Sequence, residues 1–125
     1  MEKSKIICDT DVMIDFLNPE KKRHQVVRYI LETDIELKYV TISAVYVTIS
    51  AVTKMELMVG ASNKVSLNKL NKSITRFNTL LINPEITSIA IGLLEIFKLS
   101  HNLAIPDALI AATALHADLK LLPLT

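Results

Sequence analysis

The fold of this chain is decided by a segment near its start, Lys5-Ile6-Ile7-Cys8-Asp9-Thr10-Asp11-Val12-Met13-Ile14-Asp15-Phe16-Leu17. The segment begins with a short apolar run that ends at Asp9, a pattern typical of buried parallel strands. From Val12 to Leu17 it predicts a short helix, which Asn18-Pro19 ends because the residue before a proline disfavours helical geometry. We therefore expect a buried strand followed almost directly by a helix, with Asp15 as an exposed helix residue.

Strand-like and helix-like segments alternate along the rest of the chain. Apolar spacing predicts helices over residues 21–33, 52–61, 64–78, 85–100 and 108–116, and strands within residues 39–52, 80–82 and 119–122. The 85–100 segment is apolar on most sides, so we expect that helix to be largely buried. The alternation predicts a single α/β domain over residues 1–125, with a central parallel sheet flanked by helices.

A perfect tandem repeat of seven residues lies in the β-branched stretch, with copies at Tyr39–Val45 and Tyr46–Val52. Two arrangements are open. In one, the second copy forms the strand and the first bulges out. In the other, the first copy is the strand and the second extends the following helix, because seven residues are close to two helical turns. The β-branched residues from Tyr46 to Ile49 oppose helix and favour the first arrangement.

The composition excludes several classes of protein. With 125 residues, 50% of them hydrophobic, the chain is long and apolar enough to fold, and its single cysteine excludes a disulfide scaffold. No apolar run approaches the roughly 20 residues of a membrane span, and the start of the chain does not have the pattern of a signal peptide. We therefore expect a cytoplasmic protein with no membrane segment.

The net charge of +1 is not that of a protein that coats nucleic acid, but it hides a local basic stretch. Residues 62–83 contain no acid and four basic residues: Lys64, Lys69, Lys72 and Arg76. One interpretation is a surface that binds RNA phosphates, and the other is an ordinary solvated helix face.

Three acids follow predicted strands or begin predicted helices: Asp9, Glu56 and Asp107. In doubly wound sheets, ligands bind beyond the carboxyl ends of the strands, so these acids are expected near one edge. Carboxylates gathered there repel one another, and a divalent cation relieves that repulsion and supports phosphodiester hydrolysis. The alternative is structural, with Asp11 and Asp107 capping helices and Glu56 solvated.

Three segments occur in order: Ile7-Cys8-Asp9-Thr10-Asp11-Val12-Met13-Ile14-Asp15, Ala51-Val52-Thr53-Lys54-Met55-Glu56-Leu57 and Ile105-Pro106-Asp107-Ala108-Leu109-Ile110-Ala111-Ala112-Thr113-Ala114-Leu115. They resemble the three conserved blocks of PIN-domain ribonucleases, in particular the VapC toxins of toxin–antitoxin pairs. The resemblance implies a three-layer PIN-like fold and endonucleolytic cleavage of RNA with Mg²⁺ or Mn²⁺ held by Asp9, Glu56 and Asp107. It assigns supporting positions to Thr10 and Asp11. It also implies a VapB-like antitoxin partner and a homodimer.

The chain departs from this family in the seven-residue repeat and at Leu121-Leu122-Pro123-Leu124-Thr125. Family members continue there into a fourth acid and a last strand, so we expect the final strand to be missing and the nuclease to be weak. The alternative function is an inactive remnant of the fold that binds an antitoxin or associates with itself. A phospho-receiver domain is disfavoured, because no aspartate ends the predicted strand at residues 80–82.

Overall fold

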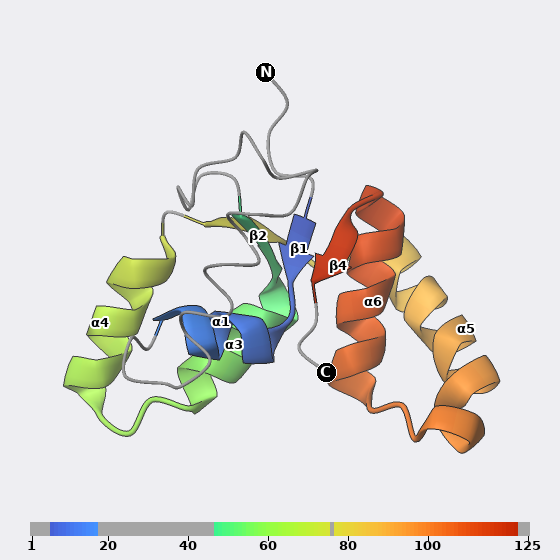
Figure 1. Cartoon of the computed structure of the whole chain (residues 1–125), viewed down its shortest axis with the longest axis horizontal. Helices are drawn as coiled ribbons and strands as arrows, with labels where there is room; N and C mark the ends of the chain where they lie inside the picture. Colours follow the sequence, from blue (N-terminus) through green and yellow to red (C-terminus); the bar gives the residue numbers. More distant parts are fainter. Residues whose placement is uncertain (1–5, 18–46, 76, 123–125) are drawn as a thin grey trace.

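The computed structural model describes residues 6–17, 47–75 and 77–122. They form the predicted α/β architecture, in which a four-stranded parallel sheet is flanked by helices (Figure 1). The strands are β1 (Ile6–Cys8), β2 (Val47–Ser50), β3 (Asn78–Leu80) and β4 (Lys120–Leu122). The helices are α1 (Thr10–Leu17), α3 (Ala51–Val59), α4 (Lys64–Ile74), α5 (Pro84–His101) and α6 (Ile105–Ala117).

The sheet has the order β3-β2-β1-β4, which places β1 in its interior. Ile6 pairs with Val47 of β2 on one side and with Lys120 of β4 on the other, and all pairs are parallel. Every residue of β1 and β2 is buried, so both faces of the central strands are covered. β4 is the edge strand of the described sheet on this side.

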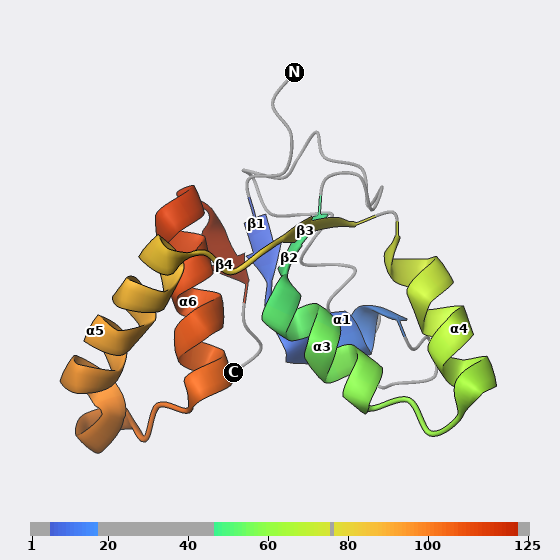
Figure 2. The same ribbon diagram turned by 180° about the vertical axis from the view of Figure 1, so that it is seen from behind.

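Two apolar clusters hold the helices in place. The larger joins β1 and β2 to α1, α3 and α4, and the smaller joins α5 to α6 through residues such as Ala90 and Ala112. Figures 1 and 2 show the two groups of helices on opposite sides of the molecule. None of the helices described is long and apolar enough to cross a membrane.

The second copy of the repeat forms the strand, as the β-branched residues predict. Val47–Ser50 is β2, and α3 begins immediately after it at Ala51. The Ser50 hydroxyl accepts a hydrogen bond of 3.1 Å from the Val52 N–H, which caps α3 and ends the strand. The first copy and the helix predicted over residues 21–33 lie outside the described residues.

The strand predicted over residues 80–82 is misplaced. The structure puts β3 at Asn78–Leu80, and Leu81 is 75% exposed instead of buried. The reason is the register with β2, in which Leu80 pairs with Ser50, the residue where β2 ends. Beyond that point β3 has no partner strand, and it is an edge strand with one side uncovered in the described sheet.

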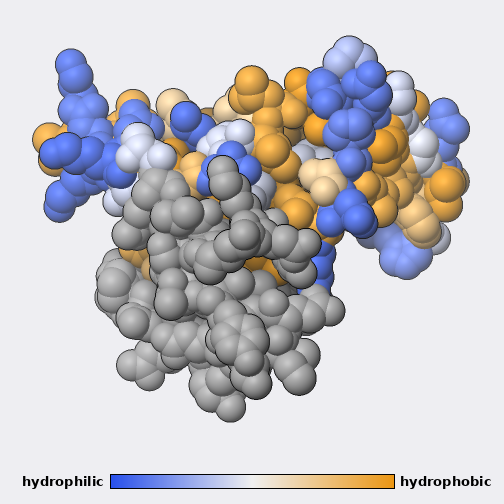
Figure 3. Space-filling model, turned by 90° about the horizontal axis from the view of Figure 1, so that it is seen from above, coloured by the Kyte–Doolittle hydropathy of each residue, from blue (hydrophilic) through white to orange (hydrophobic). Residues whose placement is uncertain are grey.

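The prediction that the helix over residues 85–100 is largely buried is wrong. In α5 only Ile86 and Ala90 are buried, whereas Ile96 is 67% and Leu99 is 99% exposed. The helix packs mainly on α6, which covers one side of it. On the right of Figure 3, where α5 and α6 lie, apolar residues therefore share the surface with polar ones.

Candidate active site

Three chain segments that bear acids meet the same edge of the sheet. Asp9 follows β1 directly, and Glu56 lies in the second turn of α3, the helix that follows β2. Asp107 lies in the first turn of α6. Because α6 leads back into β4, which runs parallel to β1, α6 begins at the carboxyl ends of the strands (Figure 2). Ligands of such sheets bind at this edge.

Asp9 is fixed by its position before α1. Its carboxylate oxygen Oδ1 accepts a hydrogen bond of 3.1 Å from the Asp11 N–H, and its carbonyl accepts one of 3.1 Å from the Met13 N–H. These bonds make Asp9 the cap of α1. The alternative interpretation that gave this role to Asp11 is wrong, because Asp11 lies inside the helix with an exposed side chain.

The carboxyl group of Asp9 is electrostatically strained. Burial raises its pKa above the ordinary value, and the like charges of Asp11 and Asp107 raise it further. The hydrogen bonds from the backbone N–H groups of Asp11 and Thr10 act in the opposite direction. Asp107 is therefore close enough to Asp9 for the two carboxylates to repel each other.

Glu56 is held through a hydroxyl group of α1. The Thr10 hydroxyl donates a hydrogen bond of 2.6 Å to Glu56 Oε1. Glu56 itself is exposed, so the bond from Thr10 is what orients its carboxylate at the edge of the sheet. A supporting position for Thr10 agrees with this contact.

Thr53 was missed by the sequence reasoning. Its Oγ1 lies 3.1 Å from Thr10 Oγ1, and the residue is completely buried. The signal was its place three residues before Glu56, which puts both on one side of α3.

Asp107 does not cap its helix. The cap position of α6 is Ala104, which makes no side-chain cap hydrogen bond, so the capping alternative for Asp107 is wrong. The Asp107 side chain is exposed in the first turn, where the helix dipole favours a negative charge. A catalytic role for Asp107 stays a prediction.

Two further titratable residues of β1 and α1 are buried. Burial, with the nearby charge of Asp9, raises the pKa of the Cys8 thiol to about 12, so Cys8 stays an inert protonated thiol. Asp15 was predicted to be exposed, but it is buried. It lies three residues after Val12, on the same buried side of α1.

The donor chemistry fits a hard divalent cation, since carboxylate oxygens are the ligands that Mg²⁺ and Mn²⁺ prefer. Among the described residues, no three His, Cys, Asp or Glu side chains form a group that could hold one metal ion. Magnesium sites often use one or two carboxylates with water and substrate phosphate. That Asp9 and Asp107 supply such a pair stays a prediction. That Glu56 joins them stays a prediction.

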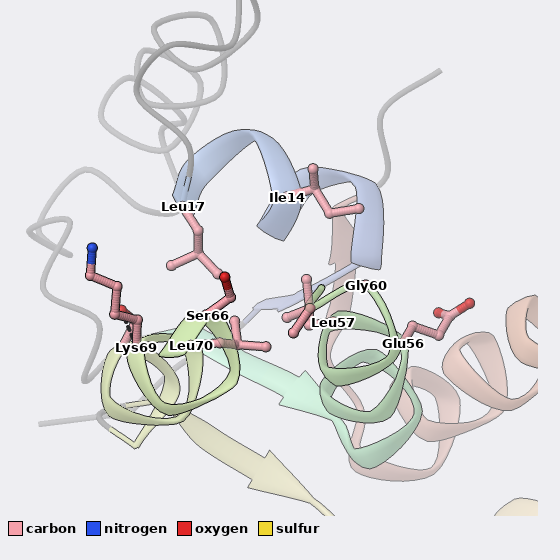
Figure 4. A pocket seen from close by; sticks show the side chains of 10 residues that line it. Ile14, Leu17, Glu56, Leu57, Gly60, Ser66, Lys69 and Leu70 are labelled. Atoms are coloured by element: carbon pink, nitrogen blue, oxygen red, sulfur yellow. Dashed lines mark hydrogen bonds between the residues drawn. The ribbon is translucent and has the colours of Figure 1, made fainter. Parts of the chain in front are cut away.

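A pocket of about 590 Å³ opens between α1, α3 and α4. Leu17, Leu57 and Leu70 line its middle, and Glu56 and Lys69 stand at opposite ends of it (Figure 4). Of the predicted RNA-binding residues that the structure describes, only Lys69 lines the pocket that Glu56 borders.

The other predicted RNA-binding residues lie elsewhere on α4 or outside the described residues. Lys64 and Lys72 are exposed on α4, and Lys72 shares a second hollow of about 620 Å³ with Lys69. Arg76 lies outside the described residues. RNA binding by this helix stays a prediction.

Comparisons with known proteins agree with the fold. The family model of the PIN domain matches residues 6–124. A toxin–antitoxin complex from Klebsiella pneumoniae contains a chain with 26% identity and a TM-score of 0.68, over 93% of this chain and 82% of that one. FitAcB from Neisseria gonorrhoeae has a chain with 23% identity and a TM-score of 0.63, over 93% and 84%.

A third similar structure is DNA-bound VapBC from Salmonella typhimurium, with 19% identity and a TM-score of 0.65 over 96% of this chain and 86% of that one. At identities below 25%, this match and the one to FitAcB show a shared fold alone. No curated protein sequence matches the chain significantly.

Proposed function

Since this chain belongs to the PIN-domain family, we propose that it is a metal-dependent endoribonuclease toxin of the VapC type. The observation that carries the proposal is the position of Asp9 directly after the buried strand β1, where burial and the like charges of Asp11 and Asp107 raise its pKa. A protein that gathers carboxylates at the carboxyl edge of a parallel sheet gains nothing in stability from doing so. A bound divalent cation turns that repulsion into attraction.

Asp9 and Asp107 would hold Mg²⁺ or Mn²⁺, with Glu56 as the third acid. When bound, such an ion lowers the pKa of water and stabilises the charge that develops on phosphate oxygens. The chain's own part is to fix these carboxylates. The cap of α1 fixes Asp9, and the Thr10 hydroxyl orients Glu56. Lys69, on the far side of the adjoining pocket, is placed to attract the phosphates of an RNA strand.

Two protein partners belong to the same proposal. The likeness to a toxin–antitoxin complex at 26% identity supports a VapB-like antitoxin that blocks the acidic edge. Exposed apolar side chains on α5 and α6 support a homodimer, because monomers rarely leave many such residues uncovered. These residues, named here the α5–α6 apolar set, are Ile91, Ile96, Phe97, Leu99, Ile105 and Leu115.

The test is cleavage of a labelled single-stranded RNA with Mn²⁺, with Mg²⁺ and with EDTA, beside single-stranded DNA of the same sequence. We expect cleavage of RNA that requires the metal and is lost in Asp9→Asn. The matched control is Asp118→Asn. This control also removes one negative charge, but at the C-terminal end of α6. Asp118 has a left-handed backbone there, which asparagine adopts readily.

Cleavage that persists in EDTA would contradict the metal dependence, and preferential cleavage of the DNA would contradict the RNA substrate. If the wild type cleaves neither strand yet still binds Mn²⁺, the alternative of an inactive fold remnant is favoured. An equal loss of cleavage in Asp9→Asn and Asp118→Asn would show that the loss of any acidic charge lowers cleavage, and it would contradict a special role of Asp9 as a metal ligand.

A further inference from the structure

Thr53 is a completely buried hydroxyl residue behind the acidic edge. It lies in the first turn of α3, and its Oγ1 is 3.1 Å from the hydroxyl oxygen of Thr10 in α1. Buried threonines in helices often bond to a carbonyl of their own helix. Thr113 in α6 does so, with a bond of 2.7 Å to the Leu109 carbonyl. Thr53 instead contacts a side chain of another helix.

The direction of the bond between the two threonines follows from counting protons. A hydroxyl has one proton to donate, and an ionised carboxylate can only accept. The Thr10 proton is used in the short bond of 2.6 Å to Glu56 Oε1. The two hydroxyl oxygens lie 3.1 Å apart, and with the Thr10 proton already used, the proton between them must come from Thr53. The result is a chain of two bonds, from Thr53 to Thr10 and from Thr10 to Glu56.

We propose that Thr53 is a positioning residue of the active site, which holds the Thr10 hydroxyl in the rotamer that donates to Glu56. The inference rests on the proposed function, because it is in metal binding that the direction of the Glu56 carboxylate matters. Thr53 is suited to the task by its burial, since a side chain packed on all sides keeps one rotamer. Thr10 is only half-buried and Glu56 is exposed, so packing fixes their side chains less firmly than that of Thr53.

The experiment compares Thr53→Val, Thr53→Ser and the control Thr113→Val by their Mn²⁺ dissociation constants and thermal midpoints. Valine keeps the shape of threonine and removes the hydroxyl. We expect Thr53→Val to weaken Mn²⁺ binding by roughly tenfold, the lower end for losing a partner that orients a ligand. Thr53→Ser should restore it. Thr113→Val, also in a buried threonine, should lower the midpoint and leave Mn²⁺ binding unchanged.

A double-mutant cycle decides whether Thr53 acts through Thr10. In the Thr10→Val background, adding Thr53→Val should not weaken Mn²⁺ binding further, because the bond it removes is already gone. Additive losses would overturn the proposal, and so would wild-type affinity in Thr53→Val.

A measurement without metal separates this inference from the proposed function. NMR couplings that report the side-chain rotamer of Thr10 should show one rotamer in the wild type and an average of several in Thr53→Val. If the wild type fails to bind Mn²⁺ but the Thr10 rotamer still depends on Thr53, the proposed function fails while the positioning contact holds. An unchanged Thr10 rotamer in Thr53→Val overturns the inference itself.

Discussion

At the carboxyl edge of the sheet, polar side chains follow a buried strand and are fixed by hydrogen bonds. On α5, by contrast, apolar side chains are exposed, because only one side of the helix is covered. Asp9 and Thr10 follow a strand that is entirely buried, and hydrogen bonds fix both side chains. Ile96 and Leu99 lie three residues apart on α5, and most of their surface faces solvent.

The difference teaches how each region would act. The edge is preorganised: hydrogen bonds fix Asp9 and Glu56, and burial, with the like charges of Asp11 and Asp107, raises the pKa of Asp9. The outer side of α5 has no such order, and its free energy falls when another apolar surface covers it. The first region thus suits an ion and the second a protein surface, so substitutions in one should leave the other's function intact.

The largest effect is expected for Asp107→Asn. Asp107 is proposed as a metal ligand, and its like charge is one of those that raise the pKa of Asp9. Its loss should therefore lower RNA cleavage by roughly 100-fold or more, beyond the usual cost of losing a partner that only orients a ligand. The cleavage rate at saturating Mn²⁺ measures the effect on the acidic edge, and sedimentation of the variant measures the effect on self-association. The oligomeric state should not change.

Glu85→Gln is the matched control for Asp107→Asn. Glu85 is also an exposed acid in the first turn of a helix with a proline at its start, but it belongs to α5. Near-normal cleavage is expected. A similar loss in the two variants would mean that first-turn charges support folding and that Asp107 has no special part.

The next largest effect is expected from Ile96→Glu combined with Leu99→Glu. If the α5–α6 apolar set forms the homodimer interface, two buried carboxylates without partners should raise the dimer dissociation constant by at least roughly tenfold. Analytical ultracentrifugation measures it. Metal-dependent cleavage per folded chain should persist at concentrations where the wild type is dimeric.

Ser88→Glu provides the control for that pair, since Ser88 is exposed on the same helix outside the apolar set. It should leave the dimer intact. A wild type that is monomeric at every concentration would remove the homodimer from the proposal and leave the apolar set to another partner.

The sequence was enough to predict the α/β fold and the edge of the sheet at which Asp9 lies. It was not enough to predict the contact that holds the Thr10 side chain there. An apolar run ending at Asp9 is a local pattern, and strand–helix alternation fixes where such ends meet. The contact between Thr53 and Thr10 joins residues 43 positions apart and depends on how two helices pack. The exposure of Leu99 was missed for a similar reason, because an apolar helix is buried only where a neighbour covers it.

A smaller effect is expected from Lys69→Ala combined with Lys72→Ala. If both lysines contact phosphates of single-stranded RNA, the slope of log affinity against log salt should become less steep by about 1.4, or about 0.7 for each contact. Affinity at low salt should fall while the Mn²⁺ dissociation constant stays constant. Lys98→Ala on α5 is the control, and an unchanged slope in the double variant would assign α4 to a plain solvated face.

The smallest effect, and the one that tests the edge most directly, is the pH dependence of stability in Asp9→Asn. Asparagine caps helices as well as aspartate does, so the change removes the charge and keeps the acceptor for the Asp11 N–H.

The pKa of Asp9 is raised by burial and by like charges. Well below the ordinary aspartate pKa of about 3.9, the group is protonated in both the folded and unfolded states and costs nothing. As the pH rises through the raised pKa of the folded state, the wild type loses stability that the variant keeps. In EDTA, urea unfolding should therefore show Asp9→Asn gaining stability relative to the wild type as the pH rises above about 3.9. Added Mn²⁺ at pH 7 should reverse the order, because an ion that binds only the folded wild type stabilises it by mass action. A difference that is constant with pH, or an order that Mn²⁺ leaves unchanged, would contradict the carboxylate repulsion on which the metal site rests.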